Sequence, residues 1–167
     1  MCHHLFEDGK RDMSVELTLA AIDLVMTDVE AASLEEAVRF TVGTSDEDAR
    51  MMAAHRGRLE AMASARWPGQ VVPRPEIVGW LHNGGGSRQA IVDLVDESWP
   101  DGVVEIADQI QDAVSESTAA WGMAFPECPV HRSHPMTPRV VDEVPYWVCP
   151  VSPDVSLAIG SVGRAVR

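Results

Sequence analysis

Four residues near the carboxyl end of the chain have the types and spacing of a metal site. Cys128 and His131 form a Cys-x2-His pair, His134 follows closely, and Cys149 comes after an interval that fits a hairpin. Thiolate sulfur and imidazole nitrogen are usual zinc ligands, and a short Cys/His step followed by a second cysteine is a common way to assemble a tetrahedral site. The sequence therefore predicts a Zn²⁺ site with Cys128, His131, His134 and Cys149 as ligands, and His134 is the best candidate for the fourth.

The same residues also have an interpretation without a metal. Cys149 and Trp147 would then be core residues of a small sheet or the relic of a lost site, and both histidines would be exposed. However, a β module of about 40 residues rarely buries enough apolar surface to fold without a disulfide or a metal. If a metal binds, four protein ligands make a structural site, whereas three ligands and a water molecule make a potentially catalytic one.

This segment resembles the C-terminal part of small uncharacterised actinobacterial proteins. Those proteins carry the pattern Cys-Pro-x-His, His-Pro and Trp-x-Cys-Pro, which is matched here by Cys128–His131, His134-Pro135 and Trp147–Pro150. The resemblance implies a degenerate zinc ribbon and no particular activity. A full ribbon has a second Cys-x2-Cys turn, but Cys149 is followed by Pro-Val-Ser152. Either His134 replaces the missing ligand, or the site has three ligands, or the metal has been lost.

The elements that must position these residues are predicted to be mostly helical. Residues 13–122 are expected to form an acidic α-helical domain of about five helices, although alternating apolar residues leave a strand possible near its start. Asn83-Gly-Gly-Gly86 is expected to be a turn, and Ser87 to cap the helix that follows. The predicted helices cover residues 13–29, 45–66, 76–82, 87–98 and 103–121, with a further helix start at 33–36.

The last predicted helix has the clearest pattern in the chain. Its apolar residues form one continuous stripe, from Val103 through Ala107, Ile110 and Val114 to Thr118 and Trp121. Residues 126–163 are expected to form a small antiparallel β module with a hairpin turn at Asp142-Glu143, and residues 1–12 a disordered extension. The predicted fold class is therefore α+β, mainly α with a small C-terminal zinc-ribbon-like β module. The predicted core consists of Leu19, Ile22, Leu59, Met62, Ile91, Leu94, Ile110, Val114 and Trp121.

Charge and composition restrict the classes of partner. The net charge is −13, with 46% hydrophobic and 23% charged residues, as in globular proteins. Residues 1–127 have a net charge of −14, and residues 128–167 have +1. So acidic a chain is repelled by phosphates, which argues against direct nucleic-acid binding and favours a protein partner with a basic surface. No apolar run is long enough to suggest a membrane span, and the first residues do not resemble a secretion signal. We therefore expect a cytoplasmic protein with reduced cysteines.

The sequence favours a non-enzymatic protein-binding or regulatory protein with a structural zinc site. One alternative is a metal-dependent hydrolase with an open zinc and Glu127 or Asp154 as general base. A second alternative is an acidic mimic of nucleic acid that inhibits a basic partner. The mimic requires carboxylates on one exposed face, and the candidates are Glu105, Asp108, Asp112 and Glu116.

Overall fold

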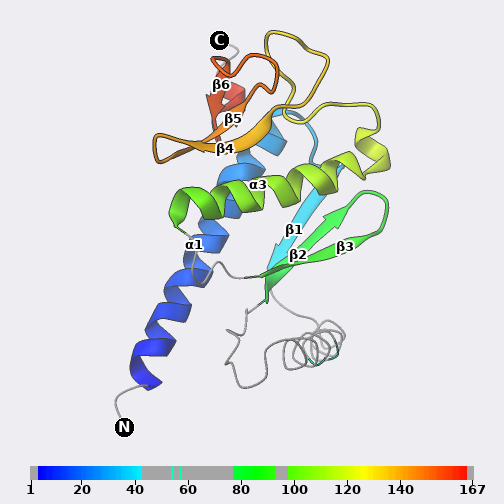
Figure 1. Cartoon of the computed structure of the whole chain (residues 1–167). Coiled ribbons are helices and arrows are strands. Elements are labelled where there is room, and N and C mark those ends of the chain that lie inside the picture. Colours follow the sequence, from blue (N-terminus) through cyan, green and yellow to red (C-terminus); the bar gives the residue numbers. More distant parts are fainter. Residues whose placement is uncertain (1–3, 43–53, 55–56, 58–76, 93–97, 165–167) are drawn as a thin grey trace.

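The structure, a computed structural model, describes residues 4–42, 54, 57, 77–92 and 98–164. Within these ranges the long helices are α1 (His4–Ala31) and α3 (Trp99–Ser115), and the strands form two three-stranded antiparallel sheets. Helix α3 packs against α1 and contacts both sheets, so that it lies between them (Figure 1). The first sheet has the order β1 (Val38–Val42), β2 (Ile77–Asn83), β3 (Arg88–Val92), and the second β4 (Thr137–Val141), β5 (Val144–Val148), β6 (Ser156–Ala158).

This architecture shows that the predicted mainly α fold class is wrong. The predicted helix 76–82 is strand β2, the predicted helix 87–98 contains strand β3, and the predicted helix start at 33–36 is a turn before β1. The error has a physical reason, because a short apolar run such as Ile77–Leu81 fits a buried strand and a buried helix segment equally well. The predicted helix 45–66 lies outside the described residues, apart from positions 54 and 57.

A hairpin at Asn83 explains why β2 and β3 pair. The Oδ1 atom of Asn83 accepts hydrogen bonds from the N–H groups of Gly85, at 3.1 Å, and Ser87, at 3.0 Å. Gly86 adopts a φ of +88°, which glycine tolerates without steric cost. The expected turn is therefore present, but it reverses a strand rather than preceding a helix capped by Ser87.

Helix α3 begins at a capped N-terminus and ends earlier than its apolar pattern suggests. Ser98 is the N-cap, and its side chain accepts from the N–H of Asp101. The helix stops at Ser115 and is followed by the 3-10 turn η1 (Thr118–Ala120). Trp121 is therefore no longer held in the helical stripe, and 85% of its surface is exposed. The prediction that it belongs to the core is wrong.

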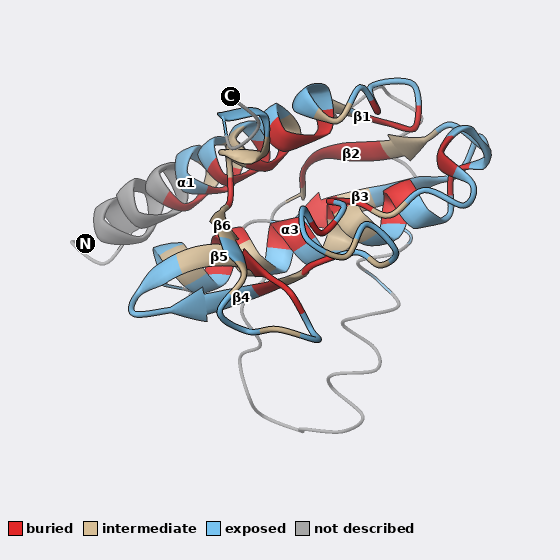
Figure 2. Ribbon diagram, turned by 90° about the horizontal axis from the view of Figure 1, so that it is seen from above, coloured by how far each residue is buried: buried red, intermediate tan, exposed pale blue. Residues whose placement is uncertain are grey.

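One hydrophobic cluster joins α1, α3 and both sheets. It includes four of the predicted core residues, Ile22, Ile91, Ile110 and Val114, and also Trp147 and Cys149 from the C-terminal segment. Leu19 is only half-buried. Figure 2 marks the buried residues of α1, β2 and α3 in red, and the exposed residues in pale blue. The predicted core residues Leu59, Met62 and Leu94 lie outside the described part of the chain.

The carboxyl-terminal sheet places Trp147 at its centre. Trp147 lies on β5, opposite Pro138 of β4 and Leu157 of β6. The turn between β4 and β5 is at Asp142-Glu143, as predicted, and both residues have positive φ. A second 3-10 turn, η2 (Val162–Arg164), follows the sheet.

Helix α1 already begins at His4, within the segment expected to be a disordered extension. No helix in the described part of the chain is long and apolar enough to cross a membrane.

Candidate metal centre

The first half of the candidate site is a closed loop between η1 and β4. An isolated bridge pairs Glu127 with Pro135, and the N–H of Cys128 donates to the carbonyl of His134 at 3.2 Å. Within the loop, the N–H of Arg132 donates to the carbonyl of Cys128 at 2.9 Å. These bonds bring the ends of the loop together and hold Cys128, His131 and His134 on one short piece of backbone.

The second half of the site is the turn that joins β5 to β6. Cys149 follows directly after Val148, the last residue of β5, and its N–H donates to the carbonyl of Val155 at 2.9 Å. The N–H of Val155 in turn donates to the carbonyl of Ser152. Because Trp147 is fixed in the core, the position of Cys149 is set by the sheet.

The structure brings the four predicted ligands together. Their donor atoms all lie within 4.8 Å of one another. The Nδ1 atom of His131 lies 3.3 Å from both Cys128 Sγ and Cys149 Sγ, and the Nε2 atom of His134 lies 3.7 Å from Cys149 Sγ. In a tetrahedral zinc site, sulfur and nitrogen ligands are separated by about 3.5 Å, given the usual metal–ligand lengths. The cluster could therefore hold one metal ion.

The surroundings of Cys128 favour its thiolate form. Burial raises the pKa of this thiol, but the backbone N–H groups of His131 and Val130 and the side chains of His131 and Cys149 lower the pKa more, to about 6. The thiolate is the form of cysteine that binds metals. Both cysteines are free and fully buried, whereas the two histidines are half-buried, so the sulfur side of the cluster faces the core.

A backbone carbonyl fixes the tautomer of His134. Its Nδ1 atom lies 2.8 Å from the carbonyl oxygen of Pro135. A carbonyl can only accept, so Nδ1 carries the proton and donates it to this bond. The lone pair of the neutral ring is then on Nε2, the atom that faces Cys149. Histidine ligands of metals are commonly oriented by a second hydrogen bond of this kind.

A buried carboxylate, Asp28 of α1, supports the site and was not identified from the sequence. Its Oδ2 atom accepts from Trp147 Nε1 at 2.8 Å and from the N–H of Gly160 at 2.7 Å, and its Oδ1 atom accepts from the N–H of Val162 at 2.8 Å. Asp28 could have been found by its place beside Val25 and Val29 on the buried stripe of α1. Burial raises the pKa of Asp28; the three N–H donors lower it by less, and the pKa remains above its ordinary value of 3.8.

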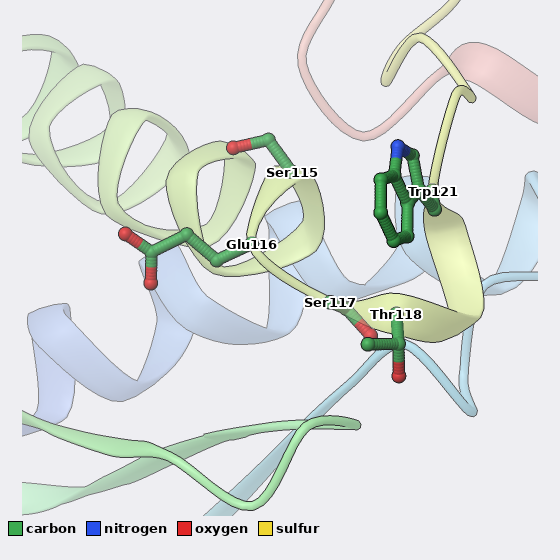
Figure 3. A pocket seen from close by; sticks show the side chains of 5 residues that line it. All are labelled: Ser115, Glu116, Ser117, Thr118 and Trp121. Atoms are coloured by element: carbon green, nitrogen blue, oxygen red, sulfur yellow. The ribbon is translucent and has the colours of Figure 1, made fainter.

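The residues required by the alternative functions are exposed. Glu127 and Asp154, the candidate general bases, are both exposed. A surface hollow of about 250 Å³ lies at the C-terminal end of α3, where Trp121 stands opposite the last helical turn (Figure 3). None of its lining residues belongs to the metal cluster: they are Ser115, Glu116, Ser117, Thr118 and Trp121.

The carboxylates predicted for the mimic form one exposed stripe along α3 and its C-cap residue, Glu116. Glu105, Asp108, Asp112 and Glu116 are all exposed, and the helix contains no basic residue. Burial, followed by the charges of Asp112 and Glu105, raises the pKa of Asp108. The stripe is thus a row of like charges, close enough for the carboxylates to affect one another.

Comparison of the chain with protein-family models, with curated proteins and with solved structures found no match. The assignment of the cluster therefore rests on its own geometry.

Proposed function

We propose that the protein binds one structural Zn²⁺ ion through Cys128, His131, His134 and Cys149. The observation that carries this proposal is the convergence of four donor atoms within 4.8 Å, two of them on fully buried cysteines. Two sulfur and two nitrogen ligands in a tetrahedral arrangement are typical of zinc. Four protein ligands complete the coordination, and this supports a structural role rather than a catalytic one.

The ion would join two segments that are otherwise connected along the chain through β4 and β5. One is the loop of residues 127–135, and the other is the turn that begins at Cys149. Four protein ligands leave no open position at the ion for a catalytic water, so we infer a non-enzymatic protein-binding or regulatory protein rather than the zinc hydrolase.

Metal analysis of freshly prepared, untagged protein tests the site. We expect about one equivalent of zinc per chain in the wild type. Cys149→Ser should lose the metal, whereas Cys2→Ser, the matched removal of a thiol outside the cluster, should keep it. Wild-type protein without zinc would contradict the proposal. X-ray absorption separates the structural site from the hydrolase: two sulfur ligands with the outer-shell scattering of two imidazole rings support the former, and the scattering of only one ring supports the latter.

The acidic stripe of α3 supports a partner with a basic surface. Like charges three and four residues apart destabilise a helix, and here no basic residue of α3 offsets them. A positively charged surface laid against the stripe would relieve this repulsion and would be attracted over a long range. The proposed partner is therefore a basic protein, bound away from the metal.

A charge-matched pair of variants tests this partner. One variant replaces the acidic side chains of the stripe (E105Q, D108N, D112N, E116Q), and the other replaces four exposed ones elsewhere (E127Q, D142N, E143Q, D154N). Proteins captured from the native cytoplasm at low salt should be lost with the first variant and kept with the second. Equal capture by both would contradict the role of α3. Displacement of the captured protein by duplex DNA would favour the nucleic-acid mimic.

A further inference from the structure

Two turns of the metal centre repeat the same sequence. Cys128-Pro-Val is followed by His131, and Cys149-Pro-Val is followed by Ser152. The first turn supplies two of the four donor atoms, but the second supplies only one. The repetition raises the question of what residue 152 does.

The backbone of the two turns is arranged alike around the sulfur atoms. The N–H of His131 hydrogen-bonds to the sulfur of Cys128, and the N–H of Ser152 donates to Cys149 Sγ at 3.2 Å. In both turns the donor is the third residue after the cysteine. The side chain of Ser152 therefore leaves the backbone at the position equivalent to that of His131, whose Nδ1 lies 3.3 Å from both sulfur atoms.

The fourth donor comes instead from outside both turns. It is the far ring nitrogen, Nε2, of His134, whereas His131 uses its near nitrogen, Nδ1. A serine hydroxyl is not among the usual zinc ligands, so Ser152 does not compete for the ion. We propose that position 152 is a latent ligand position, and that the use of His134 in its place couples metal binding to α3. This inference rests on the proposed zinc site.

The coupling runs through the segment that carries His134. The carbonyl of His134 accepts from Cys128, and two residues later Met136 is fully buried, with its N–H bonded to the carbonyl of Pro126 at 2.9 Å. The side chain of Gln111 on α3 donates to the carbonyl of Met136 at 2.7 Å and also to that of Phe125. Metal bound to His134 thus restrains the segment around Met136, which is hydrogen-bonded to α3.

A ligand at position 152 would restrain a different segment. Ser152 accepts at its carbonyl from Val155, within the turn between β5 and β6. A metal held there would close this turn, but it would leave residues 132–136 attached to the site only by backbone hydrogen bonds. Moving the ligand should therefore preserve metal binding while removing the restraint that zinc places on residues 132–136.

Three variants of the full-length protein test the inference with zinc as the probe. His134→Ala should weaken zinc affinity by about tenfold or more, since even the loss of a ligand's hydrogen-bond partner can cost that much. His134→Ala/Ser152→Cys should regain the affinity, and its Co²⁺ form should show the stronger charge-transfer absorption of a third thiolate. His134→Ala/Ser156→Cys is the matched control, with a cysteine on an exposed position of β6, and it should not regain affinity.

The readout of coupling is the slowing of amide hydrogen exchange at Met136 when zinc is added. We expect this slowing to be smaller in the Ser152→Cys double variant than in the wild type, at zinc concentrations that saturate both. A double variant no better than His134→Ala alone would overturn the latent ligand position. Restored affinity with undiminished slowing of exchange at Met136 would overturn the coupling. Wild-type protein that binds no zinc would overturn the proposed site, and this inference with it.

Discussion

Asp28 shows how one side chain can connect the two ends of the chain. Trp147, Gly160 and Val162 all donate to its carboxylate, which is almost fully buried. Sequence patterns did not reveal it, because an acidic residue in an acidic chain is usually solvated. The four residues of the candidate metal cluster were easier to identify, because cysteine and histidine are rare and their spacing is local, whereas the partners of Asp28 are distant in sequence.

We predict that Asp28→Ala destabilises the protein by about 3 kcal/mol, because it leaves the buried N–H group of Trp147 and the half-buried N–H groups of Gly160 and Val162 without an acceptor. The free energy of unfolding in urea measures the effect. Asp23→Ala, an exposed change on the same helix, should alter it by about 0.5 kcal/mol or less. Equal effects of the two substitutions would contradict the anchoring role of Asp28.

The pH dependence of stability should also reflect Asp28. Its pKa in the folded protein is raised above 3.8, so the folded state holds the carboxyl proton more tightly than the unfolded chain does. The stability that this group contributes is fully present below the unfolded pKa and is lost as the pH rises through the folded pKa. Asp28→Asn does not titrate at this position. The unfolding free energy of the wild type minus that of Asp28→Asn should therefore fall as the pH rises through this window. A value that does not change with pH would contradict the raised pKa of Asp28.

At the scale of elements, long periodic patterns were informative and short apolar runs were not. The stripe from Val103 to Val114 predicted the buried face of α3, because several turns of consistent spacing fit only a helix. The runs that became β2 and β3 were too short for this distinction, and the decisive hydrogen bonds at Asn83 depend on side-chain geometry. Trp121 was wrongly assigned to the core, because the apolar stripe does not show where the helix ends.

Ile110 and Trp121, which the sequence pattern treats alike, should respond differently to truncation. Ile110→Ala should cost about 2–4 kcal/mol, because it leaves a cavity in the core. Trp121→Ala should change the free energy of unfolding by about 0.5 kcal/mol or less, because the side chain is already 85% exposed. Thermal or urea unfolding of the two variants provides the comparison. A large loss for Trp121→Ala would mean that this side chain is buried in solution.

At the scale of the whole molecule, the C-terminal segment shares its core with the helices. The charge difference between residues 1–127 and 128–167 suggested a separate module, but Trp147 and Cys149 belong to the same apolar cluster as Ile22 and Ile110. Local composition does not show such long-range packing. It follows that the metal site and the helices should gain or lose stability together.

If the cluster holds zinc as proposed, removing the ion should destabilise the whole protein. If free zinc is about a hundredfold above its dissociation constant, binding contributes about 2.7 kcal/mol. For a chain of this size a chelator should then lower the melting temperature by about 5–10 °C. Cys149→Ser, which lacks the site, should melt at the same temperature with and without the chelator. A wild-type melting temperature that ignores the chelator would contradict the coupling of metal to fold.

The hydrogen bonds of Asp28 also determine how late in synthesis the protein can finish folding. Its partners Trp147 and Val162 lie 119 and 134 positions further along the chain. Helix α1 therefore leaves the ribosome long before the residues that cover its apolar face have been synthesised. During this interval Ile22, Val25 and Val29 have no final packing partners from the C-terminal segment, and such exposed apolar surface promotes aggregation. Truncated or stalled chains should accordingly be much less soluble than the finished protein.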